Sequence, residues 1–403
     1  MKNAVWLYFR PGFNPPAGPG EFLAWAERFG VKIVLLDCFP GARYAKKAAP
    51  DQELARFVHA CADGGLEVHG LFSALTSVPE QWIRTERREL FCVDYHGISV
   101  LDEPIAGRRY FLDPTSPEVV DLVAATSRHI LESYPALEGI QLDFIRYYHY
   151  HSRFTVLAQE LGHTLSLLAE GSPVQLVVGD KRVTFFLEQK DMLYHDPPLG
   201  KELHFHRQFS YCFCSRCIEE FCRRQGAVLP AELQSTQEKA EWILGHLGEA
   251  WVHFRAQVLE DLLAEVRRAV KGVGADKELS ITVWYSSPYG SELVGRAADL
   301  DSAVWDFGQD WWRWAEVGLV DFVCPMNYWL TTESFQMVIA KQRSRLKGDL
   351  PLFSGILRSP EHPLSGEELT AYLEAARRAG AAGLCFFHYG TWRDLDWKVG
   401  KAR

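Results

Sequence analysis

One ten-residue stretch of the sequence carries the side chains that acid–base chemistry uses. Residues 139–148 read Gly-Ile-Gln-Leu-Asp-Phe-Ile-Arg-Tyr-Tyr, so a carboxylate, a guanidinium and two aromatic rings follow a short apolar segment. This segment is too short for a helix, and its β-branched and aromatic residues favour a strand. Because an unpaired buried charge is costly, Asp143 needs a partner or a function at the end of the strand. A sugar-hydrolysing carboxylate is the leading interpretation, and an ion pair with Arg146 that closes a loop is the alternative.

Glycoside hydrolysis ordinarily requires a second carboxyl group beside the first. Asp143 is predicted to be the nucleophile or general base, and no glutamate lies at the end of any predicted strand. Asp310 is the predicted acid, because it opens a helix whose N-terminus would point toward the same site. The alternative for Asp310 is a plain helix N-cap. The remaining candidates for the second carboxyl group are Asp37, Asp113, Asp306 and Glu292.

A second candidate site lies in a cysteine-rich segment. Cys212, Cys214 and Cys217 have the spacing C-x-C-x₂-C, which lets three thiolates bind one tetrahedral metal ion such as zinc. The expected fourth ligand is one of Cys222, His206, His204 and Cys92. Such a thiolate-rich site leaves no open position for water, so the zinc would be structural. A reduced cysteine cluster and a local disulfide are the alternatives.

Two H-x-H pairs offer a competing metal site. They are His149 with His151 and His204 with His206, and both fall in the same part of the chain as the cysteines. In metal-dependent hydrolases built on a barrel, such a pair belongs at the end of the first strand. The first predicted strand contains no histidine, so these four are interpreted as polar loop residues.

The elements that would position these residues alternate between strands and amphipathic helices, which predicts a parallel sheet. Eight strands are predicted, at Val5–Arg10, Val31–Cys38, Leu66–Ser73, Leu137–Tyr147, Leu279–Tyr285, Val320–Tyr328, Leu352–Arg358 and Gly383–Tyr389. Eight strands followed by helices predict one (β/α)₈ TIM barrel over residues 1–403. A His- and Cys-rich subdomain, residues 149–237, is predicted to be inserted after strand four. An open doubly wound sheet is less favoured, because no glycine-rich loop follows strand one.

In such a barrel the carboxyl ends of the strands surround the active site. Arg146 is expected to orient Asp143, and Trp284 and Trp329 are expected to stack on sugar rings. The other predicted substrate contacts, taken from the strand ends and from the loop after strand three, are Arg10, Asp37, Asp113, Tyr147, Asn327, Tyr328, His388 and Tyr389. A structural hydrogen bond is the alternative role for each of them.

Composition excludes several other classes of protein. The net charge of −9 argues against nucleic acid as a partner, because phosphate binding needs a basic surface. No apolar run reaches the length of a membrane span, and the N-terminus lacks a secretory pattern, so a cytoplasmic protein is expected. Nine cysteines in 403 residues do not indicate a disulfide scaffold.

Several ordered segments resemble the glycoside-hydrolase-like family 10 barrels. Residues 109–114, Arg-Tyr-Phe-Leu-Asp-Pro, with Pro117-Glu118-Val119, are similar to that family's L-N-P…P-E-V loop. Residues 138–147 are similar to its D-G-I-H-L-D-Y-I-R-Y strand, with Glu138 and Gln141 in place of Asp and His. Residues 309–311 and 318–328 match its Q-D-W…G-L-V-D-F-V-x-P-M-N-Y, and 381–387 fit its last strand. The cysteine segment resembles the zinc loop of family 42 β-galactosidases.

This resemblance implies a glycosidase-type barrel that acts on an oligo- or polysaccharide, such as an amino-sugar polymer. The expected function is therefore glycoside hydrolysis by a carboxylate pair, with a structural zinc ion and no catalytic cofactor. Two alternatives stay open, a metal-dependent hydrolase that uses the histidines of the insertion and a barrel that binds glycan without cleaving it. The sugar, the linkage and the oligomeric state are left open by the sequence.

Overall fold

The computed structural model describes residues 1–10, 12–38, 51–76, 81–94, 97–102, 110–147, 211–284, 302–328, 330–360 and 362–399. It also describes the backbone of four strands between residues 173 and 204. No helix in these parts of the chain is long and apolar enough to cross a membrane.

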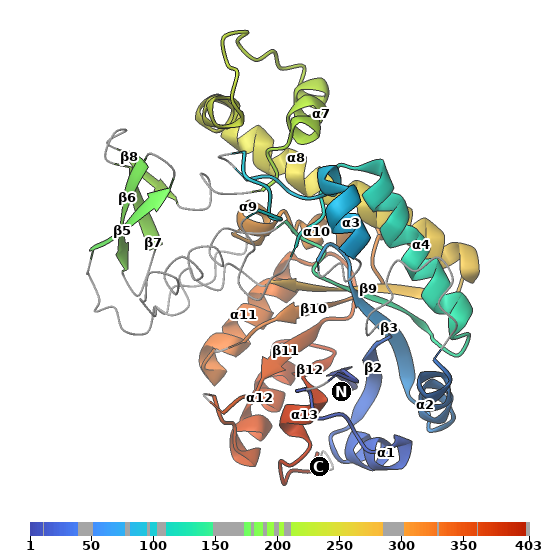
Figure 1. The fold of residues 1–403 in the computed structure, drawn as a ribbon. Helices are drawn as coiled ribbons and strands as arrows, with labels where there is room; N and C mark the ends of the chain where they lie inside the picture. Colours follow the sequence, from blue (N-terminus) through green and yellow to red (C-terminus); the bar gives the residue numbers. More distant parts are fainter. Residues whose placement is uncertain are drawn as a thin grey trace.

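Eight parallel strands form the centre of the molecule (Figure 1). They are β1 (Asn3–Leu7), β2 (Val31–Asp37), β3 (Glu67–Ser73), β4 (Gly139–Asp143), β9 (Glu278–Trp284), β10 (Phe322–Met326), β11 (Phe353–Leu357) and β12 (Gly383–Phe387). Their order is β10-β9-β4-β3-β2-β1-β12-β11, and a parallel bridge between Val323 and Leu352 joins the two outer strands of this order. The sheet is thus a nearly closed (β/α)₈ barrel, which confirms the predicted fold class.

The predicted helices lie between these strands and cover the outside of the barrel (Figure 1). They are α1 (Pro19–Arg28), α2 (Gln52–Asp63), α4 (Pro117–Ser133), α8 (Thr236–Val273), α10 (Trp311–Glu316), α11 (Thr332–Arg345) and α12 (Gly366–Arg378). Ser235 and Ser365 begin α8 and α12 with capping boxes, in which serine and a glutamate three residues later satisfy the first free N–H groups. The shorter elements are α3 (Gln81–Glu86), the 3₁₀ turn η1 (Arg88–Leu90), α7 (Ser215–Gln225), α9 (Ser302–Phe307) and α13 (Tyr389–Trp392).

A second sheet lies within residues 149–237, where the insertion was predicted. Its strands are β5 (Pro173–Val178), β6 (Lys181–Leu187), β7 (Met192–Asp196) and β8 (Lys201–His204), and each is antiparallel to its neighbour. The first two pair from Pro173 with Phe186 to Val178 with Lys181. The H-x-H residues His149, His151 and His206 lie outside the described residues, and only the backbone of His204 is described.

The barrel strands bury side chains on both faces, as parallel strands do when helices cover the sheet. One cluster fills the interior of the barrel and includes Ala4, Trp6 and Tyr8 from the first strand and its extension. The larger cluster lies between the strands and the surrounding helices and includes Val5 and Leu7. Because successive side chains of a strand alternate between its faces, membership of the inner cluster shows which strand-end residues point into the barrel.

Candidate active site at the barrel mouth

The carboxyl ends of the barrel strands, which we call the barrel mouth, bring together several side chains that point inward. Tyr8 continues the alternation of Ala4 and Trp6, and Asp37 continues that of Ile33 and Leu35. Asp143 lies two residues after Gln141, whose buried side chain donates to Thr282 and accepts from Ser280 inside the barrel. By the same alternation, the side chains that point inward at the strand ends belong to Tyr8, Asp37, Ser73, Asp143, Trp284 and Phe387.

Two carboxylates at the mouth lie near one guanidinium. Arg10 is ion-paired with Asp37, whose side chain is 1% exposed. The charges of Asp37 and Asp143 both act on Arg10, and both raise the pKa of Tyr8 after the larger effect of its burial. Asp37 and Asp143 therefore face the same space, from the strands on either side of β3. Asp37 of β2 pairs with Leu71 of β3, which pairs with Gln141 of β4. Asp143 lies two residues further along β4, so it is the next side chain of that strand to point inward.

Aromatic rings from separate strands line this space. The rings of Tyr8 and Phe13 are 4.7 Å apart, and Phe13 is also 4.7 Å from His388. Tyr328 lies 5.7 Å from the ring of Phe387 and 6.3 Å from that of Trp284. Such faces suit the C–H surface of a sugar ring, and the carboxylates between them can bind its hydroxyls.

His388 adds a neutral polar group to the mouth. Burial lowers the pKa of this imidazole to about 4, so it is uncharged at pH 7. Its side chain is 8% exposed, and Nδ1 has no hydrogen-bond partner among the described residues. It can therefore exchange a hydrogen bond with a ligand, which keeps His388 among the candidate substrate contacts.

The turn after β4 holds Asp143 and Arg146 in different surroundings. The backbone N–H of Phe144 donates to Oδ1 of Asp143 at 2.7 Å, with Phe144 in the left-handed region at φ +53°. The Arg146 guanidinium lies 4.3 Å from the Phe144 ring and 5.5 Å from the Trp284 ring. Arg146 thus packs between aromatic rings at the mouth, and its expected orienting effect on Asp143 stays a prediction.

Asp310, the predicted acid, is the N-cap of α10. Its side chain accepts a hydrogen bond from the backbone N–H of Arg313 at 3.2 Å, and its charge acts on Glu260 of the outer helix α8. These are contacts of the outer layer and fit the N-cap alternative, and the catalytic role of Asp310 stays a prediction. Asp37 is another candidate for the second carboxyl group, because it and Asp143 take successive inward positions on the two neighbours of β3.

Three other predicted substrate contacts are turned away from the mouth. Tyr389 is 1% exposed, and its hydroxyl donates to Glu21 of α1 at 2.9 Å. Tyr147 is also 1% exposed and packs against Arg255 of α8. The side chain of Asn327 exchanges hydrogen bonds with Gln342 and donates another to a serine of β11, so its amide is fully used. In each case the side chain points toward the helices instead of the barrel axis, which fits the alternative of a structural role.

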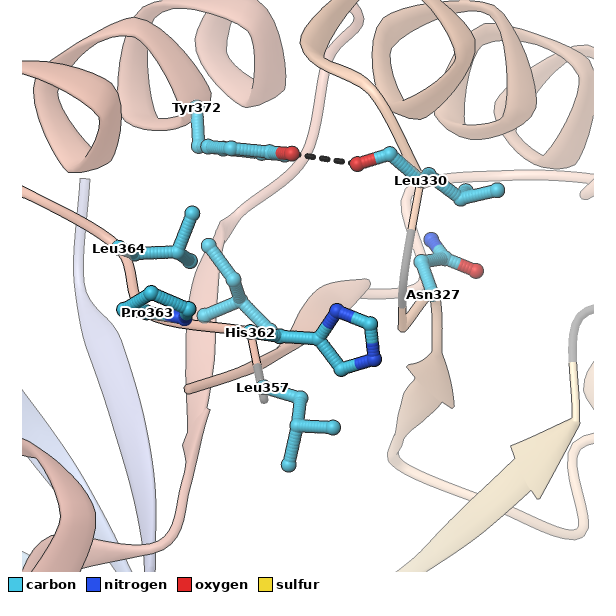
Figure 2. Close-up of a pocket in the computed structure, with 8 residues that line it drawn as sticks. Asn327, Leu330, Leu357, His362, Pro363, Leu364 and Tyr372 are labelled. Atoms are coloured by element: carbon cyan, nitrogen blue, oxygen red, sulfur yellow. Dashed lines mark hydrogen bonds between the residues drawn. The ribbon is translucent and has the colours of Figure 1, made fainter. Parts of the chain in front are cut away.

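Asn327 instead lines a separate cavity of about 260 Å³ (Figure 2). Figure 2 shows it between the end of β11, the loop that carries His362, and Tyr372 of α12. The Tyr372 hydroxyl donates to the carbonyl of Leu330, and most of the remaining lining is leucine, isoleucine and proline. The Asn327 amide and the Tyr372 hydroxyl are already paired, and His362 adds an imidazole to the lining.

A second constellation joins the cysteine segment to Asp113. One ligand atom from each of Cys212, Cys214, Cys217 and Asp113 lies within 4.8 Å of every other, and we call these four residues the Cys₃Asp cluster. Asp113, which was predicted to contact substrate, is 0% exposed, and both cysteine thiols at 214 and 217 lie 3.2 Å from its carboxylate oxygens. Of the predicted fourth ligands, the two cysteines are described and are not members. Cys222 is on the half-exposed side of α7, Cys92 hydrogen-bonds the Leu112 carbonyl at 3.3 Å, and the side chains of both histidines lie outside the described residues.

The surroundings of the Cys₃Asp cluster suit a divalent cation. Backbone N–H groups of Val93 and Cys217 donate to the sulfurs of Cys212 and Cys214, at 3.2 Å and 3.4 Å. Burial raises the pKa of Cys212 to about 11, and burial followed by the charge of Cys214 raises the pKa of Asp113 to about 7. A bound cation would favour the deprotonated forms that act as ligands. Three thiolates and one carboxylate are a donor set that Zn²⁺ accepts in tetrahedral geometry.

One residue of the mouth that the sequence analysis missed, Tyr8, could have been predicted from the strand pattern. Tyr8 could have been found from the alternation Ala4, Trp6, Tyr8, which places it on the inner face of the first strand. Asp113 had no such signal, because it follows a long excursion after β3 whose path through space is not encoded in a periodic pattern. The contact between this excursion and the cysteine segment forms only when the chain folds, so no local sequence pattern predicts it.

No family model matches the sequence, and neither does any curated protein. Solved structures do match. The catalytic domain of β-amylase from Paenibacillus polymyxa has a TM-score of 0.52 at 12% identity, over 96% of this chain and 92% of that one. The β-galactosidase from Rahnella sp. R3 has a TM-score of 0.59 at 11% identity, over 96% and 50%. That of Halorubrum lacusprofundi has a TM-score of 0.56 at 13% identity, over 96% and 52%.

The chain thus spans about half the length of the β-galactosidases that it matches. At these identities the likeness establishes the (β/α)₈ barrel, which these glycoside hydrolases also have. Activity has to be argued from the residues at the mouth.

Proposed function

We propose that this protein is a glycoside hydrolase whose carboxylate pair is Asp143 and Asp37. The observation that carries the proposal is that both carboxylates take successive inward positions at the barrel mouth, on the two neighbours of β3, where the rings of Phe13, Tyr328 and Trp284 also gather. Glycosidases place two carboxyl groups beside the sugar whose linkage they cleave. Asp143 is the nucleophile or general base in this proposal, as the sequence predicts, and Asp37 replaces Asp310 as its partner.

The proposed substrate is an oligosaccharide or polysaccharide bound across the open mouth. His388 and Ser73 would contact its hydroxyls, and Trp284 and Tyr328 would supply apolar ring faces. Trp329, the other predicted stacking residue, lies outside the described residues. The resemblance to the family 10-like barrels suggests an amino sugar, whereas the solved structures with similar folds include β-galactosidases and a β-amylase. All three classes of glycan belong in the test.

The Cys₃Asp cluster is proposed to hold a structural zinc ion. Its four ligand atoms come from two distant parts of the chain, so a bound ion would tie the cysteine segment to the excursion after β3. With four protein ligands, no coordination position is left for a catalytic water. A metal-dependent hydrolytic reaction at this cluster is therefore not proposed.

The first experiment measures reducing-end release from β-linked glucosamine and N-acetylglucosamine oligomers, β-galactosides and α-linked glucans. We expect wild-type protein to hydrolyse at least one class, and we expect Asp143→Asn and Asp37→Asn each to lower kcat by 10²-fold or more. Asp349→Asn is the matched control, because Asp349 is exposed in the turn between α11 and β11, at the opposite end of the barrel.

Two outcomes would revise the proposal. If Asp310→Asn abolishes turnover while Asp37→Asn does not, the pair expected from the sequence is correct and the pair proposed here is wrong. If wild-type protein binds one of these glycans in calorimetry but turns over none of them, the protein is a glycan-binding barrel. Circular dichroism of every variant shows whether its fold survives, which separates lost chemistry from lost structure.

A further inference from the structure

One wall of the cavity in Figure 2 is also part of the barrel mouth. Phe353 belongs to the inner cluster of the barrel and Ile356 to the outer one, so the alternation of β11 turns Leu357 inward at the end of the strand. Leu357 pairs in register with Phe387 of β12, which points into the mouth. Because Leu357 also lines the cavity, it is a wall that the two spaces share.

The aromatic surface of the mouth reaches this shared wall. A Cβ on Gly355, the inward position before Leu357, would come within 3.2 Å of the Tyr328 ring, so this ring lies against the inner face of β11. The Tyr328 ring is 5.7 Å from the ring of Phe387 and 6.3 Å from that of Trp284. A sugar that stacks on these rings is therefore bound beside Leu357.

The lining of the cavity is mainly apolar. Apart from Asn327, His362 and Tyr372, every residue that lines it is leucine, isoleucine or proline, and none is aspartate, glutamate, lysine or arginine. The Asn327 amide and the Tyr372 hydroxyl make their hydrogen bonds within the protein. Figure 2 shows the imidazole of His362 between Leu357 and Asn327. Such a lining favours an uncharged and mainly apolar group.

The volume of the cavity, about 260 Å³, limits the occupant to one small group. An apolar cavity of about 150 Å³ is large enough for benzene, so this one has room for a single aromatic ring with a short substituent. Complete ligand sites enclose roughly 300–1,000 Å³. The rest of a larger ligand must therefore lie outside the cavity, and the barrel mouth is the space on the other side of Leu357.

We propose that this cavity is a side subsite of the barrel mouth that binds the apolar, uncharged aglycone of a glycoside, such as a phenyl group. The sugar lies on the rings of the mouth, and the aglycone passes the end of β11 at Leu357. This inference rests on the proposed function, because it requires that the sugar binds in the mouth. It adds small glycosides with one apolar aglycone to the substrates proposed above.

Pairs of thioglycosides that differ only in the aglycone test this inference without turnover, because sulfur in place of the glycosidic oxygen resists hydrolysis. Calorimetry on wild-type protein compares the phenyl and methyl forms of 1-thio-β-galactoside, 1-thio-N-acetyl-β-glucosaminide and 1-thio-α-glucoside. In at least one pair we expect the phenyl form to have a Kd at least tenfold lower than the methyl form, because its ring leaves water on binding.

Two leucine variants show whether the phenyl group occupies the cavity. Leu364→Trp enlarges a half-buried lining residue and should bring the Kd of the phenyl form to within threefold of that of the methyl form, with the methyl form unaffected. Leu350→Trp is the matched control, because Leu350 is also half-buried but precedes the opposite end of β11. This variant should keep the wild-type preference for phenyl.

Should Leu364→Trp fail to fold, a crystal structure of wild-type protein with the phenyl thioglycoside gives the same answer. The phenyl ring should then lie between Leu357 and Tyr372, which line the cavity from β11 and from α12.

Three results would contradict the proposed subsite. One is an equal Kd for the phenyl and methyl forms in every pair that binds. Another is a preference for phenyl that survives in Leu364→Trp, or a phenyl ring that lies outside the cavity in the crystal. The third is no binding of any of these thioglycosides. Reducing-end release decides the glycosidase proposal separately, so either proposal can fail while the other stands.

Discussion

Asp113 shows how much a single side chain depends on its surroundings. By type and by its place after a strand it was predicted to contact substrate, yet the fold buries it among thiols and pairs it with Arg216 at 2.9 Å. The Thr115 hydroxyl donates to the same carboxylate, and it lies 3.3 Å from the sulfur of Cys217. These contacts orient the carboxylate toward the three cysteines, which is the arrangement expected of a metal ligand with its supporting hydrogen bonds.

Replacement of Asp113 by alanine should therefore weaken metal binding. We expect the affinity for Zn²⁺, measured by competition with a chromogenic chelator, to fall at least tenfold, because removal of a direct ligand should cost no less than removal of a supporting contact. Asp102→Ala is the matched control, since Asp102 is exposed and pairs with Arg88. Equal affinities in the two variants would show that the carboxylate is not a ligand.

At the scale of the elements, the sequence predicted the strands and helices of the barrel well. All eight predicted barrel strands exist, and β2 and β3 begin or end within one residue of the predicted bounds. The reason is that buried parallel strands are continuous apolar runs and the helices between them carry clear caps. The direction of residues just beyond a strand was harder to predict. Asn327 and Tyr389 lie where the alternation of the strand has stopped, and both turn toward the helices.

Gln309 is the polar side chain that joins two barrel strands behind the mouth. It is 0% exposed, it accepts from the Trp284 N–H at 3.0 Å, and it donates to the carbonyl groups of Ile145 and Thr282. The ends of β4 and β9 are thus held together by one amide. This contact belongs to the motif that carries the family resemblance, although its role could not be read from the sequence because it depends on how the chain returns after β9.

Gln309→Leu should lower the free energy of unfolding by about 3 kcal/mol, because it leaves a buried N–H and at least one buried carbonyl without partners. Urea denaturation followed by tryptophan fluorescence measures the change. Gln234→Leu, in the exposed loop before α8, should change it by no more than about 0.5 kcal/mol. Similar losses in both variants would mean that the hydrogen bonds of Gln309 add little to the joint between the strands.

At the scale of the whole molecule, the two ends of the barrel differ in the residues that they carry. The carboxyl ends of its strands carry the polar and aromatic residues of the mouth, whereas their amino ends carry ion pairs that hold the barrel together, such as Arg267 with Asp321 at 3.1 Å. Fold class followed from the sequence because it depends on a repeated pattern. The union of the cysteine segment with Asp113 did not, because it joins residues about 100 positions apart that no pattern relates.

His69 lies near the amino end of β3, and its burial connects the stability of the whole barrel to pH. The residue is 0% exposed and neither ring nitrogen has a hydrogen-bond partner among the described residues. Gly139 lies against it, where a Cβ would come within 2.7 Å of the imidazole. The charge of Asp321 favours a protonated imidazole, and the carboxylate of Glu278, 3.8 Å away, is 45% exposed and well solvated. Burial dominates and lowers the pKa of His69 to about 4.

This lowered pKa predicts a loss of stability in acid. Between pH 6.5 and 4 the unfolded chain binds a proton at His69 that the folded barrel excludes, so stability falls as the pH falls through this window and is constant outside it. A shift of that size corresponds to at most about 3 kcal/mol. The difference in unfolding free energy between wild type and His69→Leu should therefore change by up to that amount from pH 7 to pH 4. His59→Leu, at an exposed position of α2, should leave the pH profile of wild type unchanged. A parallel pH profile for His69→Leu and wild type would show that the folded protein protonates His69 as easily as the unfolded chain does.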